Sequence, residues 1–413
     1  MKKDQIHLIN YSGPKIRHWK IELVEGEDSY TISFGTDLNK LKTSIKKCTS
    51  GAYLKYHSEI YKKLGEGFMY RNTAPSGDPY ELLYLLREPN KGNTRVFDIH
   101  PNGKQLVMGS QKWGSKGAEI HVLDLESGVL TLLYSVDGRY LRIHSVHFNA
   151  AGDKIFFLLQ TAVKILDINT GEVTDFAEYQ ESMNGPNPHY VSPVFNVPRN
   201  RYLYFSEGAV NVCDEHLKPV FGLRLAFDSH EKQCKLACIS PSGRLLALHY
   251  TRHGILDSEQ ISHIDIWDID NNELINSIEV DRLDIHKMGF NPSETEIVFI
   301  RFAALGPGFY DIKTGKLIRW FKDSYEGSWA NRFDFAYSPN GKLLAAGHFL
   351  LDAKLEKYLL TPDYYANAKP WKVMFSADSK YCIEGGDAGK ILIRHAAPID
   401  AGRPFKDVQT AEQ

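Results

Sequence analysis

Histidine is the residue type whose number and spacing could support metal chemistry here, since the 413 residues include 16 histidines. His144 and His147 lie three residues apart on an expected strand, so their side chains point to opposite faces and cannot share one ion. His249 and His253 lie on either side of a strand end, where a structural or exposed role is the simpler interpretation. We therefore expect no metal site and no cofactor.

Cysteine is the second candidate for site chemistry. The chain has 5 cysteines, an odd number, and no Cys-x-x-Cys pair among them. Such a set fits free thiols in a reducing compartment better than a disulfide framework. No apolar run reaches about 18 residues, and the basic N-terminus is not followed by an apolar signal segment. We expect a cytoplasmic protein that does not associate with a membrane.

Four aspartates occupy matching places in repeated segments, which argues against acid–base catalysis. They are Asp124, Asp167, Asp268 and Asp311, and each ends an expected strand just before a turn. A catalytic pair would be unique and would have its pKa values pushed apart, whereas a repeated aspartate suits hydrogen bonding within a repeated turn. The chain also lacks the motifs of nucleophile elbows, zinc proteases and nucleotide-binding loops. We expect that the protein is not an enzyme.

The elements that would position these residues repeat along the chain. Residues 335–348, FAYSPNGKLLAAGH, are typical of a short strand, a tight turn and a second strand. A second pair of strands follows most copies of this segment. Four strands per repeat and seven repeats predict a seven-bladed β-propeller, a mainly-β fold. Copies about 40–50 residues apart, a spacing expected of propeller blades, lie at 97–110, 146–159, 194–207, 237–250, 288–301, 335–348 and 373–386.

The two ends of the repeat array predict how the ring closes. Residues 81–88, ELLYLLRE, indicate a strand without a partner of its own, while the last repeat ends after a third strand at 390–395. Because unpaired sheet edges invite aggregation, we expect 81–88 to add as the outer strand of the last blade. The expected organisation is a small α+β domain at 1–72, a linker at 73–80, the propeller at 81–400 and a tail at 401–413.

Residues 1–72 repeat nothing downstream and form the expected small domain. Segments 18–26 and 29–35 alternate apolar and polar residues, as two antiparallel strands with one wet face do. We expect a lysine-rich connection next and then a helix over 50–65, which Gly65 would cap at its C-terminal end. One stripe of that helix holds Ala52, Tyr56, Ile60 and Leu64.

The order of motifs in this part resembles the WGR domain, which is named for a Trp-Gly-Arg motif and occurs in poly(ADP-ribose) polymerases and many bacterial multidomain proteins. In family members that bind nucleic acid, the motif arginine contributes to binding. Here Phe34-Gly35-Thr36 stands where Trp-Gly-Arg would be, so the resemblance implies a retained fold without that contact. The resemblance covers about residues 16–68, with framework residues Trp19, Tyr30, Phe34, Gly35 and Gly67.

The downstream repeats resemble WD repeats over about residues 81–398. Trp267-Asp268 is the literal Trp-Asp dipeptide, and Gly347-His348 matches the Gly-His pair of that family. The resemblance implies a propeller that closes by pairing strands from the two ends of the repeat array.

Binding is better supported than catalysis. Loops that join the fourth strand of one blade to the next blade, and the second strand to the third, emerge at one end of a propeller. Aromatic and arginine side chains in these loops would anchor a partner, because they bury large areas with little loss of rotamer freedom. The alternative for two tryptophans of this set, at positions 329 and 371, is packing under their own loops. The predicted rim residues are Trp113, Arg139, Tyr140, His189, Tyr190, Arg252, His253, Tyr325, Trp329, Arg332 and Trp371.

Charge is distributed unevenly between the two expected parts. Residues 1–72 have 13 Lys and Arg against 8 Asp and Glu, a net charge of +5, whereas the whole chain carries −2 and the remainder therefore −7. A basic domain could contact phosphates, dock on the acidic propeller or present a solvated surface. The candidate phosphate contacts are Lys40, Lys42, Lys46 and Lys47.

These patterns predict a non-enzymatic cytoplasmic scaffold. Its propeller rim would bind a protein or peptide partner, and its N-terminal domain would bind a second partner. The alternative is a nucleic-acid-associated factor that uses the basic domain. A propeller enzyme with its site in the channel has the least support.

Overall fold

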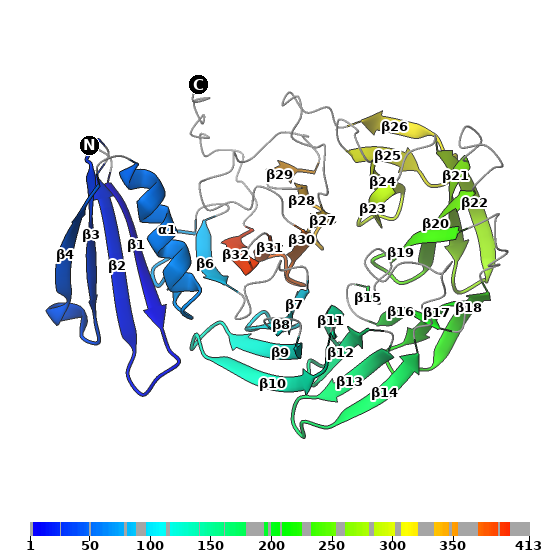
Figure 1. Cartoon of the computed structure of the whole chain (residues 1–413). Helices are drawn as coiled ribbons and strands as arrows, with labels where there is room; N and C mark the ends of the chain where they lie inside the picture. The colour runs from blue at the N-terminus through cyan, green and yellow to red at the C-terminus, as the bar shows by residue number, and fades with distance from the viewer. Residues whose placement is uncertain are drawn as a thin grey trace.

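The computed structural model is a succession of antiparallel β-sheets around a common centre, with helix α1 beside the N-terminal strands (Figure 1). Strands dominate, so the expected mainly-β class is confirmed. The described residues are 3–24, 26–48, 51–77, 81–87, 96–112, 116–139, 141–160, 162–178, 194–196, 200–206, 209–224, 233–252, 261–280, 285–301, 307–320, 334–346, 349–353, 371–386 and 389–396.

The largest sheet joins strands from the two ends of the described chain. It has nine strands in the order β30-β31-β32-β6-β5-β1-β2-β3-β4. We call β30, β31, β32 and β6 the closing sheet. The bounds are β1 (Lys3–Asn10), β2 (Arg17–Val24), β3 (Ser29–Gly35), β4 (Lys42–Lys47), β5 (Met69–Arg71), β6 (Leu82–Arg87), β30 (Lys372–Phe375), β31 (Tyr381–Gly385) and β32 (Lys390–His395).

The other sheets each consist of consecutive strands, and we number them along the chain. Sheet 1 has β7 (Phe97–Ile99), β8 (Gln105–Gln111), β9 (Gly117–Asp124) and β10 (Leu130–Asp137). Sheet 2 has β11 (Ile143–Phe148), β12 (Lys154–Leu159), β13 (Ala162–Asp167) and β14 (Val173–Glu178). Sheet 3 has β15 (Val194–Phe195), β16 (Arg201–Ser206), β17 (Ala209–Asp214) and β18 (Pro219–Arg224).

Sheets 4 to 6 complete the series. Sheet 4 has β19 (Gln233–Ile239), β20 (Leu245–Arg252), β21 (Ile261–Asp268) and β22 (Glu273–Val280). Sheet 5 has β23 (Ile285–Phe290), β24 (Glu296–Arg301), β25 (Pro307–Asp311) and β26 (Leu317–Trp320). Within the described residues, sheet 6 has β27 (Phe335–Tyr337), β28 (Leu343–Ala346) and β29 (Phe349–Asp352).

The first strand of each sheet is its innermost one. β7 contacts β11, β11 contacts β15, β19 contacts β23, and β27 contacts β30, so consecutive sheets meet along these strands (Figure 1). Apolar clusters fill the space between neighbouring sheets; Phe156 of sheet 2, for example, packs on Phe195 and Tyr202 of sheet 3. The repeated hairpins therefore form a ring-like array, which is compatible with a propeller.

The array closes where the closing sheet meets sheet 1. β6 pairs antiparallel with β32, which is the pairing predicted for residues 81–88. Lys372 on β30 donates a 2.6 Å hydrogen bond from Nζ to the carbonyl oxygen of Phe97 on β7. Ile391 and Ile393 of β32 share a buried core with Phe97 and Ile99. The two ends of the array are thus held together by strand pairing, a core and a direct hydrogen bond.

The N-terminal strands form a sheet that α1 (Ala52–Leu64) covers on one face. The predicted stripe of the helix is confirmed, since Ala52, Tyr56, Ile60 and Leu64 are all buried. Gly65 follows the helix in a right-handed conformation, and the left-handed residue that the chain reversal needs is Gly67, with φ of +82°.

The lysine-rich segment after β3 was wrongly expected to be only a connection. A short 3-10 helix, η1 (Leu38–Lys40), is followed by edge strand β4 at Lys42–Lys47. Lysines on an edge strand discourage pairing with other chains, which explains how a lysine-rich strand can lie there. Strand β1, which lies between β2 and β5, was not anticipated.

The N-terminal sheet and the closing sheet share one core. β5 pairs with β1 on one side and with β6 on the other. Leu85 of β6 and Leu392 of β32, both 0% exposed, pack in the same cluster as Trp19 and Tyr56. Lys390 also lies against α1, with Nζ 5.3 Å from the ring centroid of Tyr61. The N-terminal part is therefore attached to the ring by a continuous sheet.

Candidate functional site

Most of the predicted rim residues lie outside the residues that the structure describes. Arg139 and Trp371 lie within the described residues. For Arg252 the structure describes the backbone, which pairs with Ile261 at the end of the β20–β21 hairpin. The rim as a binding surface therefore stays a prediction. The residues outside the described ranges are Trp113, Tyr140, His189, Tyr190, His253, Tyr325, Trp329 and Arg332.

Arg139 and Trp371 each precede the innermost strand of a sheet. Arg139 is exposed between β10 and β11. Trp371 is partly buried just before β30, and its backbone N–H donates to the carbonyl oxygen of Gly385 at 2.8 Å. Because the sheets repeat around one centre, these two positions lie at the same end of the ring.

A charged cluster lies close to Arg139 on sheet 1. Lys112 Nζ is 2.6 Å from Asp137 Oδ1 and 3.8 Å from Glu119 Oε1. The hydrogen bond from Lys112 lowers the pKa of the Asp137 carboxyl. His121 Nε2 is 3.7 Å from Glu119 Oε2, but burial lowers the pKa of this histidine. The predicted rim end thus carries at least one fixed group of opposite charges beside its arginine.

Charged side chains also link the innermost strands of sheets 5, 6 and the closing sheet. Lys287 Nζ of β23 is 2.8 Å from Asp334 Oδ1, just before β27. Asp334 Oδ2 in turn accepts a 3.0 Å hydrogen bond from the backbone N–H of Val373 on β30. Burial alone would lower the pKa of Lys287, but the Asp334 carboxylate raises it overall, so the Lys287 amine stays protonated.

The same arrangement continues from sheet 1 to sheet 2. Asp98 Oδ2 on β7 accepts a 2.8 Å hydrogen bond from the backbone N–H of Phe148 on β11. The same carboxylate lies 3.9 Å from Nδ1 of His147. On sheet 4, burial raises the pKa of Cys238 to about 12, against the opposing effect of Lys287. The Asp98 carboxylate thus connects the innermost strands of sheets 1 and 2. The Cys238 thiol stays protonated and is therefore a poor nucleophile.

The repeated aspartates have the predicted role in turns. Asp124 Oδ1 accepts from the backbone N–H of Ser127 at 2.6 Å, and Asp311 Oδ1 accepts from that of Thr314 at 2.7 Å. Backbone hydrogen bonds lower the pKa of both carboxyls. Asp167 and Asp268 accept in the same way from the residues after them, so the turn role is confirmed.

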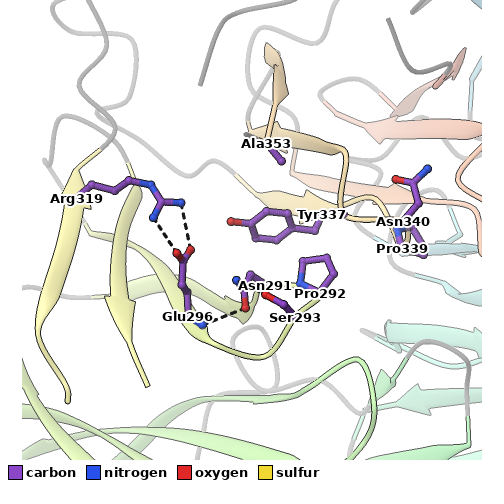
Figure 2. A pocket seen from close by; sticks show the side chains of 10 residues that line it. Asn291, Pro292, Ser293, Glu296, Arg319, Tyr337, Pro339, Asn340 and Ala353 are labelled. Carbon is purple, nitrogen blue, oxygen red and sulfur yellow. Dashed lines mark hydrogen bonds and ion pairs between the residues drawn. The ribbon is translucent and has the colours of Figure 1, made fainter. Parts of the chain in front are cut away.

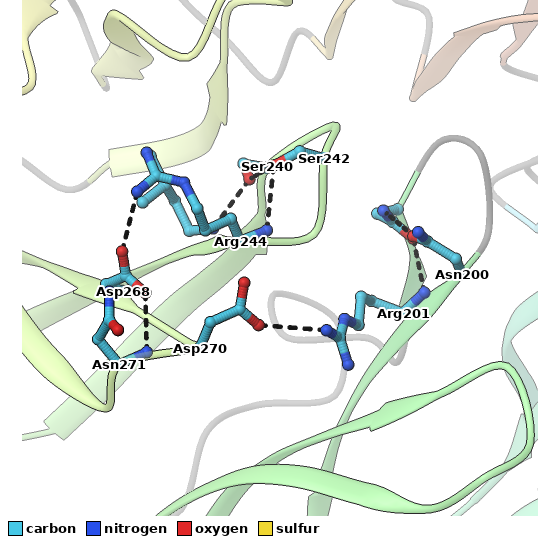
Figure 3. A network of polar contacts seen from close by, with 10 residues as sticks. Asn200, Arg201, Ser240, Ser242, Arg244, Asp268, Asp270 and Asn271 are labelled. Atoms are coloured by element: carbon cyan, nitrogen blue, oxygen red, sulfur yellow. Dashed lines mark hydrogen bonds and ion pairs between the residues drawn. The ribbon is translucent and has the colours of Figure 1, made fainter.

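Sheets 3 and 4 are joined by polar contacts at the end of the ring that carries these turns (Figure 3). Arg201 Nη2 of sheet 3 is 3.2 Å from Asp270 Oδ1 of sheet 4. Arg244 Nη1 donates to Asp268 Oδ2 at 2.9 Å, and Asp268 belongs to the Trp-Asp dipeptide. Half of the Arg244 side chain and half of Asp270 are exposed, so each pair stabilises the fold by about 1 kcal/mol at most.

A pocket of about 500 Å³ opens between sheets 5 and 6 at the same end of the ring (Figure 2). Arg319 on β26 forms a bidentate pair with Glu296 on β24, at 2.9 Å to Oε1 and 3.1 Å to Oε2. The guanidinium carbon also lies 4.0 Å from the ring centroid of Phe309. Sequence reasoning missed this pocket. Its lining residues are Asn291, Pro292, Ser293, Glu296, Arg319, Tyr337, Pro339, Asn340, Gly341 and Ala353.

The framework residues of the N-terminal domain divide into buried and exposed sets. Trp19 and Tyr30 are 3% and 6% exposed, so they stabilise the fold. Phe34 lies opposite Trp19 but is 48% exposed. At Gly35, an added Cβ would lie 3.2 Å from Leu41 Cδ2, which explains the small residue there.

The candidate phosphate-binding lysines are exposed but do not share one face. Lys42 pairs with Phe34 and therefore lies on the helix side of the sheet, whereas Lys47 pairs with Ser29 on the opposite side. A second basic group, not anticipated from the sequence, surrounds Phe68. Arg17 Cζ is 5.3 Å from its ring centroid, and Lys63 Nζ is 5.5 Å from it. Lys40 and Lys46 are exposed as well.

Two N-terminal histidines lie in contact on the sheet. His7 Nε2 is 3.2 Å from His18 Nδ1, and burial, with Lys20 nearby, lowers the pKa of His7 to about 4. The part of the chain that the structure describes has no group of three or more His, Cys, Asp or Glu that could hold a metal ion. Within that part, none of the helices has the length and apolar character needed to cross a membrane.

Comparison with known proteins gives no family assignment. A scan against protein-family models found no match for this chain, and a search of curated proteins found none either. The resemblances to WGR domains and WD repeats therefore remain part of the proposal below.

Proposed function

We propose that the protein is a non-enzymatic scaffold, built as a seven-bladed WD-repeat-like propeller preceded by a WGR-like domain. The rim that includes Arg139 and Trp371 binds a protein or peptide partner. The N-terminal domain binds a second partner through its exposed side.

The continuous nine-stranded sheet is the observation that carries this proposal. β5 is hydrogen-bonded to β1 and to β6, and Leu85 and Leu392 extend the N-terminal core into the closing sheet. A backbone-paired sheet with a shared core holds its two ends in a fixed relation, whereas a flexible tether would not. Two surfaces held in a fixed relation are what a scaffold for two partners needs.

The state of the turn acids favours binding over catalysis. A general acid at neutral pH needs a carboxyl whose pKa is raised, as burial without hydrogen bonds would do. Backbone hydrogen bonds instead lower the pKa of Asp124, Asp167 and Asp311. These acids are therefore ionised acceptors that stabilise turns.

One observation favours the alternative of a nucleic-acid-associated factor. The half-exposed ring of Phe34 on β3 lies opposite Lys42 on β4, on the same face of the sheet. Cations next to aromatic rings suit phosphates and bases. The absence of the motif arginine, with Thr36 in its place, counts against this alternative.

The experiment that tests the scaffold proposal is affinity capture with the full chain as bait, followed by mass spectrometry. The rim variant is Arg252→Ala with Trp329→Ala. The matched control is Lys316→Ala with Leu317→Ala, two exposed residues at the opposite end of the ring. We expect the rim variant to lose a partner that the control retains. Equal capture by both variants, or capture of nothing specific by the full chain, would contradict the proposal.

A further inference from the structure

In the described part of the chain, polar contacts between the turns that connect first and second strands join four pairs of neighbouring sheets. Such contacts hold adjacent turns together and leave little space between them. In the described residues they join sheets 1 and 2, 3 and 4, 4 and 5, and sheet 6 with the closing sheet. The bridged pairs are His100 and Gly152 at 3.2 Å, Asn196 and Pro241 at 2.9 Å, Ser242 and Glu294 at 2.6 Å, and Asn340 and Ser379 at 3.1 Å.

The corresponding turns of sheets 5 and 6 enclose the pocket of about 500 Å³ instead. The turns approach each other at Gly341, where an added Cβ would lie 3.5 Å from Pro292. The Asn291 side chain hydrogen-bonds within its own turn, where its Oδ1 accepts from the backbone N–H groups of Thr295 and Glu296. The pocket volume lies within the range of about 300–1,000 Å³ that small-ligand sites have.

The polar wall of the pocket carries no net charge. Glu296 and Arg319 neutralise each other through two parallel hydrogen bonds, and the stacking of Arg319 on Phe309 fixes the guanidinium. A charged ligand would find no unpaired opposite charge in this pair. Hydroxyl groups, which both donate and accept, can hydrogen-bond to a carboxylate and a guanidinium that lie side by side.

The remaining walls offer apolar ring surfaces. In Figure 2 the ring of Tyr337 lies in the pocket with its hydroxyl pointing toward the Glu296–Arg319 pair, and the rings of Pro292 and Pro339 lie on the other side. An aromatic face and proline rings suit a ligand ring with C–H groups on its faces. Fixed donors and acceptors at one edge suit hydroxyl groups on the perimeter of that ring.

We infer that this pocket binds a pyranose ring of an uncharged saccharide. Tyr337 stacks on the C–H face of the sugar, and Glu296 and Arg319 hydrogen-bond to neighbouring hydroxyls. The site lies at the end of the ring opposite the predicted rim, so it is separate from the partner site of the proposed function.

The test is a titration of the full chain with neutral monosaccharides and their charged counterparts, followed by ligand-observed NMR. The probes are glucose, galactose and mannose, each compared with its uronic acid and its amino sugar. We expect at least one neutral sugar to bind, and to bind more tightly than both charged counterparts. Tyr337→Ala is expected to weaken that binding about tenfold or more, and Tyr337→Phe to retain most of it because the ring is kept.

Tyr134→Ala is the matched control, since this tyrosine is also partly buried but lies on β10 of sheet 1. It should leave sugar binding unchanged, and circular dichroism should show that both alanine variants are folded. If the Tyr337→Ala variant is unfolded, Tyr337→Phe and Glu296→Gln carry the test, and the latter is expected to weaken binding. No binding by any neutral sugar, tighter binding of a uronic acid, or binding that survives loss of the Tyr337 ring would overturn the inference.

Discussion

The substitution Leu392→Ala probes how the N-terminal part is joined to the ring. Leu392 lies on β32 of the closing sheet, is 0% exposed, and packs in the same core as Tyr56 of α1. Truncating a fully buried leucine to alanine costs about 2–5 kcal/mol of unfolding free energy. With a urea slope of about 3 kcal/mol/M, a loss of about 3 kcal/mol lowers the unfolding midpoint by about 1 M.

The assay is urea unfolding followed by circular dichroism, together with hydrogen exchange measured by mass spectrometry. The exchange of amides in β1–β4 and in β30–β31 is read separately. Because these strands share one sheet and one core, we expect the substitution to lower protection in both sets together. Leu132→Ala on β10 is the control, since this leucine is 50% exposed and its loss should cost no more than about 0.5 kcal/mol. Unchanged exchange in β1–β4 of the Leu392→Ala protein would refute the reasoning.

Three further predictions concern closure, turn acids and nucleic acid. A chain that begins at Phe97 lacks β6 and leaves the edge of β32 unpaired, so it should aggregate on size-exclusion chromatography; a monomer as heat-stable as the full chain would refute this. The hydrogen bonds from Thr314 lower the pKa of Asp311, so the stability that this carboxylate contributes is present at neutral pH and is lost as pH falls below about 4. Asp311→Ala should therefore lower the melting temperature at about pH 7 and make melting less sensitive to acid, and an unchanged pH profile would count against the turn role. Duplex DNA at physiological salt should bind weakly or not at all, and tight binding that the triple variant Lys42→Glu, Lys46→Glu and Lys47→Glu abolishes would favour the alternative function.

The repeated part of the fold could be predicted because its signals are local. A Ser-Pro-Asn-Gly turn, or an Asp-x-x-Ser/Thr-Gly turn, sets its own geometry through hydrogen bonds to the backbone and left-handed glycines, as at Gly128, Gly171 and Gly315. Asp214 was missed as a turn residue because its turn, Asp-Glu-His-Leu, has Leu217 in the left-handed conformation, whereas the turns after Asp124, Asp167 and Asp311 have glycine there. The pairing of 81–88 could be predicted because a ring leaves one position open.

The N-terminal sheet was predicted less completely, for two physical reasons. β4 reads KTSIKK, with Ile45 as its one apolar residue, so no alternation of apolar and polar residues marks it as a strand. β1 has few apolar residues, with Ile6 and Leu8 buried on one face and His7 between them, so the alternation is short. Both strands form because neighbouring strands and α1 supply their partners.

The candidate sites could be predicted only in part. The rim was inferred from residue types in loops, whereas the pocket arises where the turns of two different repeats stand apart, which no local pattern reports. The charged residues that link the innermost strands of sheets 5, 6 and the closing sheet do follow a pattern in the sequence. Lys287, Asp334 and Lys372 each lie four residues before the first turn residue of consecutive repeats, and their charges alternate along the chain.

The most direct test of the scaffold proposal measures two quantities on one variant. For a partner captured by the full chain, the affinity and the melting temperature of Arg252→Ala with Trp329→Ala are compared with those of the unaltered protein. If the rim is the partner site, affinity should fall by about 2 kcal/mol or more per hot-spot residue, while the melting temperature stays nearly constant. If affinity is unchanged and the protein melts at a lower temperature, Trp329 is a core residue and the rim proposal is contradicted.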